Sequence, residues 1–188
     1  AETFFAIGDV KRGKDILNDL PESVGKTYVT AKFNFSNGHY QEATKLLQSL
    51  ISRNEPKASS HVLLGQIFEA MGNKTSALVQ YQKASLEEPR WFLPHLHLGR
   101  LHLEFSNFDA AIDKIRLAKE LEFNGIQAAA LESQYQSYRY QLLEARRLSA
   151  KVVSVDSNNF EQLVALGIIE LKAGNAEQAL SNFTKASA

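Results

Sequence analysis

The sequence predicts an all-α protein in which a helix–turn–helix unit repeats every 34 residues. The first observation is an alanine that recurs with this period, at Ala43, Ala77, Ala111, Ala145 and Ala179. Five alanines in phase would arise by chance in roughly one sequence per thousand, and such a period is typical of repeat proteins. The second observation is composition: the 188 residues include 24 Leu and 22 Ala, but only 4 Pro and 10 Gly. Leu and Ala favour helices, whereas Pro and Gly interrupt them.

Three further sets of equivalent positions in successive repeats, here called columns, keep the same period. They predict where each helix packs and where it ends. Glycines that allow two helices to approach closely precede their alanines by twelve residues, at Gly65, Gly99 and Gly167. Glycines suited to a left-handed helix cap precede them by five residues, at Gly38, Gly72 and Gly174. Large side chains that fill the space between helices follow by four residues, at Tyr81, Ile115 and Phe183.

Residues 58–91 illustrate the unit, element by element. Leu64 and Phe68 fall at helical spacing on a first helix, and the alanine column marks the second helix. Gly72 stands in the turn between the two helices, followed by an asparagine. Pro89 ends the second helix, because proline cannot continue the hydrogen-bond ladder. The predicted unit is therefore helix, tight turn, helix, turn.

This unit resembles the tetratricopeptide repeat. The residues that carry the resemblance are His61-x-x-Leu64-Gly65-x-x-Phe68, Ala77, Tyr81, Ala84 and Pro89. The last unit has a second set of matching residues, Leu163-x-x-Leu166-Gly167, Gly174-Asn175, Ala179, Phe183 and Ala186. The resemblance implies a right-handed α-solenoid, or superhelix, whose first helices line a concave face that binds proteins.

We expect five successive units, the last of which is truncated at its end: residues 24–57, 58–91, 92–125, 126–159 and 160–188. Residues 1–23 are expected to be the second helix of a preceding unit, because Gly8-Asp9 is typical of a turn and Ile16 and Leu17 follow on a helix. Two helices from each unit and one from this segment make about eleven helices. A chain that starts and ends inside repeats is interpreted as a fragment of a longer, bacterial array.

The unit at 126–159 departs from the pattern. The strict 34-residue phase places Glu132 and Ser133 at the usual Leu–Gly pair. Because burying an unpaired carboxylate is costly, we expect a one-residue slip. The slip would put Leu131 and Tyr135 on the packing face and would be followed by a longer or irregular turn.

Composition excludes several classes of function. The 21 basic and 21 acidic residues give a formal net charge of zero, which disfavours nucleic-acid partners and anionic membrane surfaces. Cysteine is absent, which excludes disulfides, thiolate metal sites and a cysteine nucleophile. The longest apolar run, Leu163–Ile169, is far shorter than the roughly 20 residues of a membrane span, so we expect no membrane insertion.

No catalytic, cofactor or metal site is expected. His95 and His97 are two residues apart on one helix and face about 200° apart, so they cannot easily share a metal. His61 and His95 occupy a packing column, whereas His97 is placed toward the inner surface. No acid–base pair, strained nucleophile turn or phosphate-binding glycine loop is present. The adjacent basic residues Arg146 and Arg147 are interpreted as a solvated face. We therefore expect a protein that is not an enzyme.

The candidate ligand site consists of polar or aromatic residues on the first helices, at positions that reach the concave side in the family: Lys32, Phe35, Gln66, Glu69, His97, Arg100, Gln134 and Tyr138. Arg100 supplies a planar donor fork and Tyr138 a rigid aromatic contact, and both types are enriched at binding hot spots. The carboxylate clamp and the asparagine ladder of known members of the family are absent from the corresponding positions.

The functional hypothesis is a protein- or peptide-binding scaffold. The resemblance to long bacterial arrays suggests the assembly of a larger cell-envelope or secretion-type complex, with the cytoplasm as the alternative compartment. Two other functions remain open: a structural spacer or oligomerisation segment, and a regulatory array attached to an enzyme. We also expect weak self-association through the ends, where Ile16, Leu17, Leu180 and Phe183 have less cover than their interior equivalents.

Overall fold

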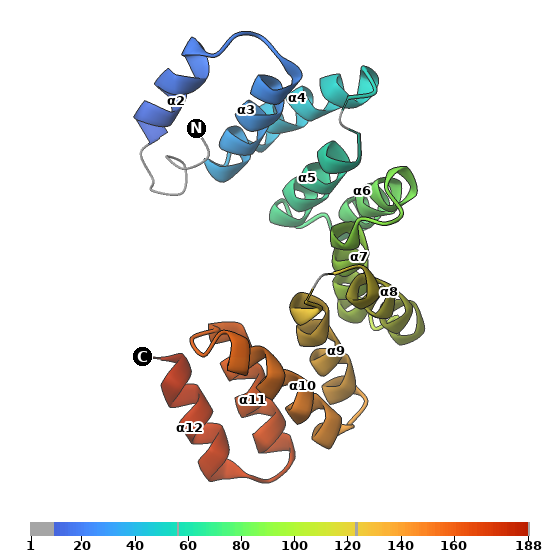
Figure 1. Ribbon diagram of the computed structural model, residues 1–188, viewed down its shortest axis with the longest axis vertical. Coiled ribbons are helices and arrows are strands. Elements are labelled where there is room, and N and C mark those ends of the chain that lie inside the picture. Colours follow the sequence, from blue (N-terminus) through green and yellow to red (C-terminus); the bar gives the residue numbers. More distant parts are fainter. Residues whose placement is uncertain (1–9, 56, 123, 188) are drawn as a thin grey trace. The chain divides into compact units, whose positions relative to one another are not determined.

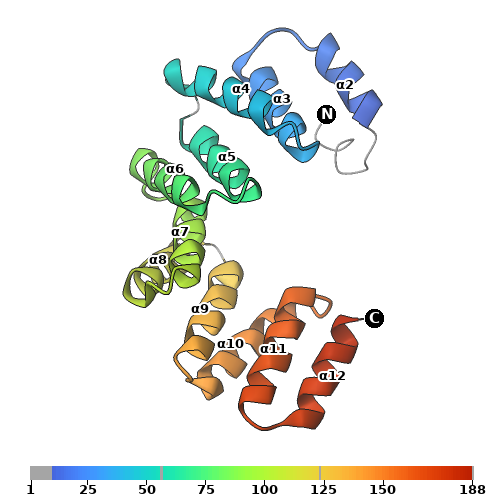
Figure 2. The same cartoon turned by 180° about the vertical axis from the view of Figure 1, so that it is seen from behind.

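A computed structural model of the chain describes residues 10–55, 57–122 and 124–187. These residues form eleven α-helices and no strand, as the sequence predicts (Figures 1 and 2). The chain divides into two compact units, Ala1–Pro89 and Arg90–Ala188. The expected turn at Gly8-Asp9 lies outside the described residues.

Apart from α2 in the first unit, the helices of each compact unit pack in consecutive pairs. The first unit contains α2 (Val10–Asp19), α3 (Val24–Ser36), α4 (Tyr40–Ser52), α5 (Lys57–Ala70) and α6 (Lys74–Glu87). The second unit contains α7 (Phe92–Glu104), α8 (Phe108–Leu121), α9 (Ile126–Tyr138), α10 (Leu142–Val155), α11 (Phe160–Lys172) and α12 (Ala176–Ala186). The closest pairings are α3 with α4, α5 with α6, α7 with α8, α9 with α10 and α11 with α12.

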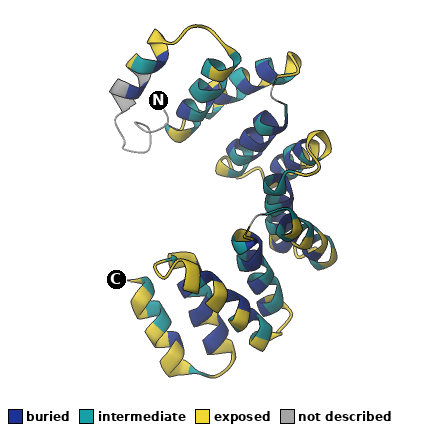
Figure 3. Ribbon diagram, viewed as in Figure 1, coloured by how far each residue is buried: buried dark blue, intermediate teal, exposed yellow. Residues whose placement is uncertain are grey.

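The periodic small residues lie where the two helices of a pair touch. The alanine column is fully or almost fully buried in every pair, at Ala43, Ala77, Ala111, Ala145 and Ala179. Gly65 lies directly against the Tyr81 ring, and Gly99 lies against Ile115. Burial is therefore concentrated on the faces inside each pair (Figure 3).

The turns inside the pairs share one hydrogen-bond pattern. In the α5–α6 turn, the amide of Gly72 donates to the carbonyl of Glu69 at 2.8 Å, and the amide of Asn73 donates to that of Phe68 at 2.7 Å. Gly72 adopts a φ of 77°, in the left-handed region that glycine reaches without strain. Two non-glycine residues take the same conformation in their own turns: Ser106 at 59° and Tyr140 at 58°.

The expected slip in 126–159 is wrong in its phase and in its irregular turn, although Leu131 is buried and Tyr135 packs beside it, as the slip required. Ser133 is fully buried and takes the place of the column glycine, with its hydroxyl donating to the Ala145 carbonyl at 2.8 Å. Glu132 is not an unpaired buried carboxylate, because Lys119 Nζ lies 2.5 Å from its Oε2. The turn has the regular length, since the amide of Gln141 donates to a carbonyl five residues earlier at 2.9 Å, as in the other pairs. The ion pair from α8 thus removes the cost that motivated the slip.

Two further expectations need correction. Arg146, interpreted from the sequence as part of a solvated face, forms an ion pair with the buried Glu170 at 2.6 Å. Leu17 is only 4% exposed, so the prediction of an uncovered side chain there is wrong. At the other end, Leu180 is 68% exposed and Phe183 is partly covered, in agreement with the expectation for α12.

Candidate functional site

A pocket of about 510 Å³ lies in the second unit, on the face formed by the first helices of three consecutive pairs. Its walls come from α7, α9 and α11, which the 34-residue repeat places side by side. Arg100, Gln134 and Tyr138, three of the predicted site residues, line it together. Volumes of this size are typical of ligand pockets.

Helix α11 supplies the apolar wall of the pocket. Val164 and Ile168 lie one helical turn apart, and Phe160 lies one turn before them at the start of the helix. Ile168 and Phe160 are 44% and 61% exposed. The opposite face of α11 is buried, so this stripe is available to a ligand rather than used in the core.

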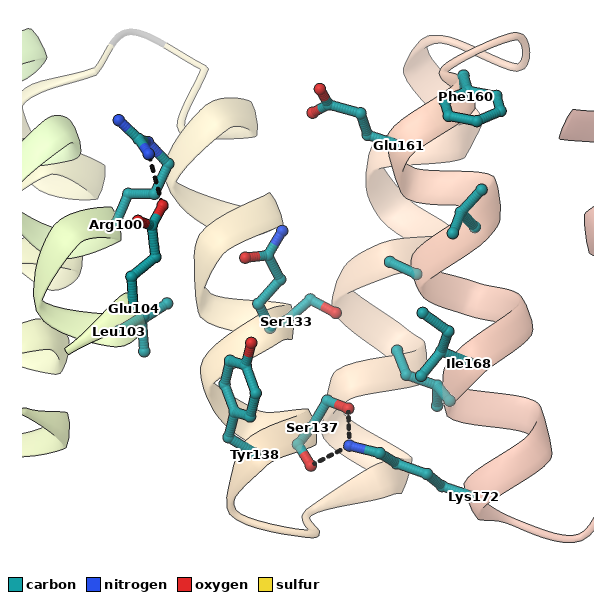
Figure 4. A pocket seen from close by; sticks show the side chains of 14 residues that line it. Arg100, Leu103, Glu104, Ser133, Ser137, Tyr138, Phe160, Glu161, Ile168 and Lys172 are labelled. Atoms are coloured by element: carbon teal, nitrogen blue, oxygen red, sulfur yellow. Dashed lines mark hydrogen bonds and ion pairs between the residues drawn. The ribbon is translucent and has the colours of Figure 1, made fainter. Parts of the chain in front are cut away.

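Helix α9 supplies a polar and aromatic wall. Tyr138 is 54% exposed, and its ring lies 6.0 Å from that of Phe108. Lys172 Nζ, which reaches across from α11, donates to the carbonyl and the hydroxyl of Ser137 at 3.2 and 3.1 Å (Figure 4). The same ammonium lies 5.8 Å from the centre of the Tyr138 ring. These contacts hold the two side chains at one rim of the pocket.

The charges at the pocket come from two opposite pairs of side chains. Arg100 and Glu104, one turn apart on α7, form an ion pair at 2.6 Å (Figure 4). Glu161 and Lys172 lie near the two ends of α11. The pocket has no net charge, so it has no general preference for anionic or cationic ligands.

A second, smaller pocket of about 270 Å³ is formed by neighbouring parts of the same helices. It is lined by His97, together with Arg100 and Gln134, which border both pockets. Four of the eight predicted residues therefore lie close together in the second unit.

The other four predicted residues lie in the first unit and have contacts of their own. Phe35 packs against Tyr40 with ring centres 6.0 Å apart, beside a buried core cluster. Glu69 accepts a hydrogen bond from the hydroxyl of the buried Tyr81. Lys32 and Gln66 are half-buried on α3 and α5. None of the four lines the pocket of about 320 Å³ that the first unit contains.

Sequence reasoning did not select Phe160, Glu161 or Ile168 as site residues, although all three line the larger pocket. Glu161 and Ile168 stand at the second and ninth positions of their unit, which are among those that reach the inner face in the family. Taking every position that reaches the concave side in the family, rather than a selection of them, would therefore have found these two residues. Phe160 is a first-position residue, and only the packing of α11 brings it to the pocket.

Burial in the helix packing is the main influence on the pKa values of two histidines, His61 and His102. Burial lowers the pKa of His61 below its usual 6.5, although a 2.8 Å hydrogen bond between Nδ1 and Gln80 Oε1 acts in the opposite direction. Burial and nearby Lys114 likewise lower the pKa of His102. Within the described ranges, no cluster of three His, Cys, Asp or Glu side chains is arranged to hold a metal ion. The helices that the structure describes are also too short or too polar to cross a membrane.

Comparisons with known proteins agree with this architecture. The sequence profile of the family described as Tetratricopeptide repeat matches residues 34–91. A tetratricopeptide repeat protein from Parabacteroides merdae has a similar fold, with a TM-score of 0.78 and 16% identity over 99% of this chain and 75% of that one. Residues 34–91 thus match the tetratricopeptide repeat family, and the chain has the fold of tetratricopeptide repeat proteins.

Two further solved structures share this fold. One is the APC/C hetero-tetramer Cut9–Hcn1, with a TM-score of 0.80 and 15% identity over 92% of this chain and 34% of that chain. The other is YrrB, a protein with an unusual peptide-binding site, with a TM-score of 0.65 and 17% identity over 92% and 89% of the two chains. No curated protein sequence matches significantly. Tetratricopeptide repeats are typical of protein-interaction scaffolds, which are generally not enzymes.

Proposed function

We propose that the chain is a scaffold that binds a peptide segment of a partner protein in the pocket of α7, α9 and α11. The observation that carries the proposal is the convergence of three first helices on a pocket of about 510 Å³ with an exposed apolar wall. Exposed Ile168 and Phe160 have no role in the core of the described chain, and an apolar stripe of this kind is typical of an interaction surface.

The composition of the pocket fits a peptide better than a small polar metabolite. Val164 and Ile168 offer contacts to apolar side chains, while the side-chain amide of Gln134 offers a hydrogen-bond donor and an acceptor. Tyr138 adds a large, rigid surface with a polar tip, which is a frequent hot-spot residue. The peptide-binding site named for YrrB, a relative in fold, supports the same class of ligand.

A selection from a displayed peptide library tests the proposal directly. Peptides that bind the wild-type chain should lose about tenfold or more in affinity when Ile168→Ser and Tyr138→Ala are combined, because an apolar wall and an aromatic contact are removed. Leu143→Ser is the matched control, since Leu143 is 80% exposed on α10 and lies outside the pocket. Equal losses in the control and in the pocket variant would place the site elsewhere.

A narrower role, in the assembly of a larger cell-envelope or secretion-type complex, rests on the resemblance to bacterial arrays alone and stays a prediction. Self-association has one supporting observation, the 68% exposure of Leu180 on α12. A leucine that is exposed on a helix could form a weak apolar contact with a second copy of the chain.

A further inference from the structure

The pocket carries an unneutralised charge near each end of α11. Glu161 lies in the first turn and Lys172 is the last residue of the helix. Neither takes part in an ion pair within the described part of the chain, whereas Arg100 and Glu104 pair with each other. Eleven residues at about 1.5 Å each place the backbones of Glu161 and Lys172 roughly 16 Å apart along the helix axis.

The cationic end is held in position rather than left to move freely. Lys172 Nζ donates two hydrogen bonds to Ser137 and lies 5.8 and 5.4 Å from the ring centres of Tyr138 and Tyr140. These contacts leave the ammonium without a carboxylate partner inside the described chain. A positioned ammonium loses less side-chain entropy when it binds an anion than a freely moving one does.

The space between the two charges suits an extended peptide. Gln134 lines it, and its side-chain amide makes no hydrogen bond within the described ranges, so it can both donate to and accept from a peptide backbone. A helical peptide would have its backbone groups already bonded internally, so its backbone would make no use of the Gln134 amide. An extended chain exposes these groups at every residue.

We propose that the pocket selects an extended segment of a partner protein that has a basic side chain and a carboxylate about five residues apart, with apolar side chains between them. At about 3.3 Å per residue, five residues cover the 16 Å between Glu161 and Lys172. The basic group binds at Glu161, the carboxylate binds at Lys172, and the apolar side chains contact Val164 and Ile168. This inference rests on the proposed function, because it specifies the ligand of the same site.

Fluorescent hexapeptides with one apolar core, Leu-Ser-Leu-Ser, and different ends test the inference. With amidated C-termini, the peptide with Arg and Glu ends should bind about three- to tenfold more tightly than those with two Arg or two Glu ends at low salt. The advantage should shrink in high salt, since the charges are near the surface. A fourth peptide with an Arg end and a free C-terminal carboxylate distinguishes a terminal carboxylate from an acidic side chain.

Charge variants of the protein show whether the two ends act as proposed. Lys172→Glu should shift the preference toward the peptide with two Arg ends, and Glu161→Lys toward that with two Glu ends. Lys172→Gln and Glu161→Gln remove each charge without reversing it, and circular dichroism verifies that every variant folds. Lys185→Glu is the matched control, because Lys185 is exposed on α12 outside the pocket, and it should leave the preferences unchanged.

The outcomes separate this inference from the proposed function. Preferences that follow the two charge reversals support the inference. Binding of all peptides with equal affinity, lost in the Ile168 and Tyr138 double variant, would leave the peptide-binding function standing and overturn the charge rule. If no hexapeptide binds, the inference is wrong, and the library selection, which assumes no charge pattern, decides the proposed function on its own.

Discussion

Replacing Gly65 with alanine should destabilise the first unit, because the added methyl group would overlap a buried ring. An ideal Cβ at Gly65 would lie 2.7 Å from Cζ and 2.8 Å from Cδ1 of Tyr81, whereas ordinary contacts begin near 3.4 Å. The ring must therefore retreat by at least about 0.7 Å, which corresponds to overpacking. Tyr81 is fully buried and its hydroxyl donates to Glu69 at 2.5 Å, so the ring has no free space to enter.

The magnitude follows from three contributions. Overpacking of a core costs about 1–3 kcal/mol, and a strained Tyr81–Glu69 hydrogen bond adds up to about 1 kcal/mol. Alanine recovers about 0.5–1 kcal/mol, because glycine is a poor helix former. The middle of these ranges sums to about 2 kcal/mol, and we expect Gly65→Ala to lower the free energy of unfolding by about that amount.

Gly25→Ala is the matched control, since it makes the same chemical change in the same compact unit. The nearest atom to a Cβ at Gly25 is Ser23 Oγ at 3.9 Å, an ordinary contact. This variant should therefore be unchanged or more stable by up to about 1 kcal/mol. The assay is urea unfolding followed by circular dichroism at 222 nm, with the shift of the midpoint compared between the two variants.

A second measurement isolates the contact with the ring. In a Tyr81→Leu background the smaller side chain leaves room, so Gly65→Ala should cost at least about 1 kcal/mol less than in the wild type. If Gly65→Ala is as stable as the wild type, or if the two substitutions are additive, the steric reasoning is wrong.

Four further predictions follow from other parts of the structure. Ser106→Gly should raise the free energy of unfolding by about 0.5–1 kcal/mol in urea titrations, because φ of 59° is strained for serine; a loss of stability would contradict this. Arg146→Met should lower it by about 1–2 kcal/mol, since it leaves the 7% exposed Glu170 side chain without its cation, whereas Arg147→Met in the exposed neighbouring pair should not move the midpoint. The stability that neutral His61 contributes should be present above about pH 6.5 and should decline as the pH falls through the lowered pKa of the folded state. His61→Gln should therefore flatten this part of the curve of unfolding free energy against pH. An unchanged slope in this variant would contradict the assignment to His61. Leu180→Ser should weaken any concentration-dependent association in sedimentation experiments, and a wild-type chain that is strictly monomeric at high concentration would remove that idea.

The helices and their turns could be predicted from sequence because the signals are local. A small residue every 34 positions, a glycine at each turn and apolar residues at helical spacing depend only on neighbours along the chain. The structure confirms them, with Ala77 and Ala111 buried and Gly72 in the left-handed conformation. The same positional regularity placed Arg100, Gln134 and Tyr138 on first helices that meet at one pocket.

Contacts between different helices decided the environment of two charged residues that the repeat pattern of the sequence predicted wrongly. Glu132 looked too costly to bury in phase, but Lys119 from the preceding helix supplies its charge partner. Arg146 looked solvated, but it neutralises Glu170 on the following helix. Such pairs lie 13 and 24 residues apart in the chain, and no helical periodicity connects them.

The sequence by itself determined the repeat, the helices and the face on which ligand residues were sought. The tertiary structure decided which of those residues come together, because a pocket needs three helices to converge while helical periodicity describes one helix at a time. It also decided that Tyr140 takes a strained left-handed φ of 58° in place of glycine. Packing on both sides of that turn keeps its length the same as in the other pairs, and the cost of about 1–2 kcal/mol is offset by the contacts of the helices it joins.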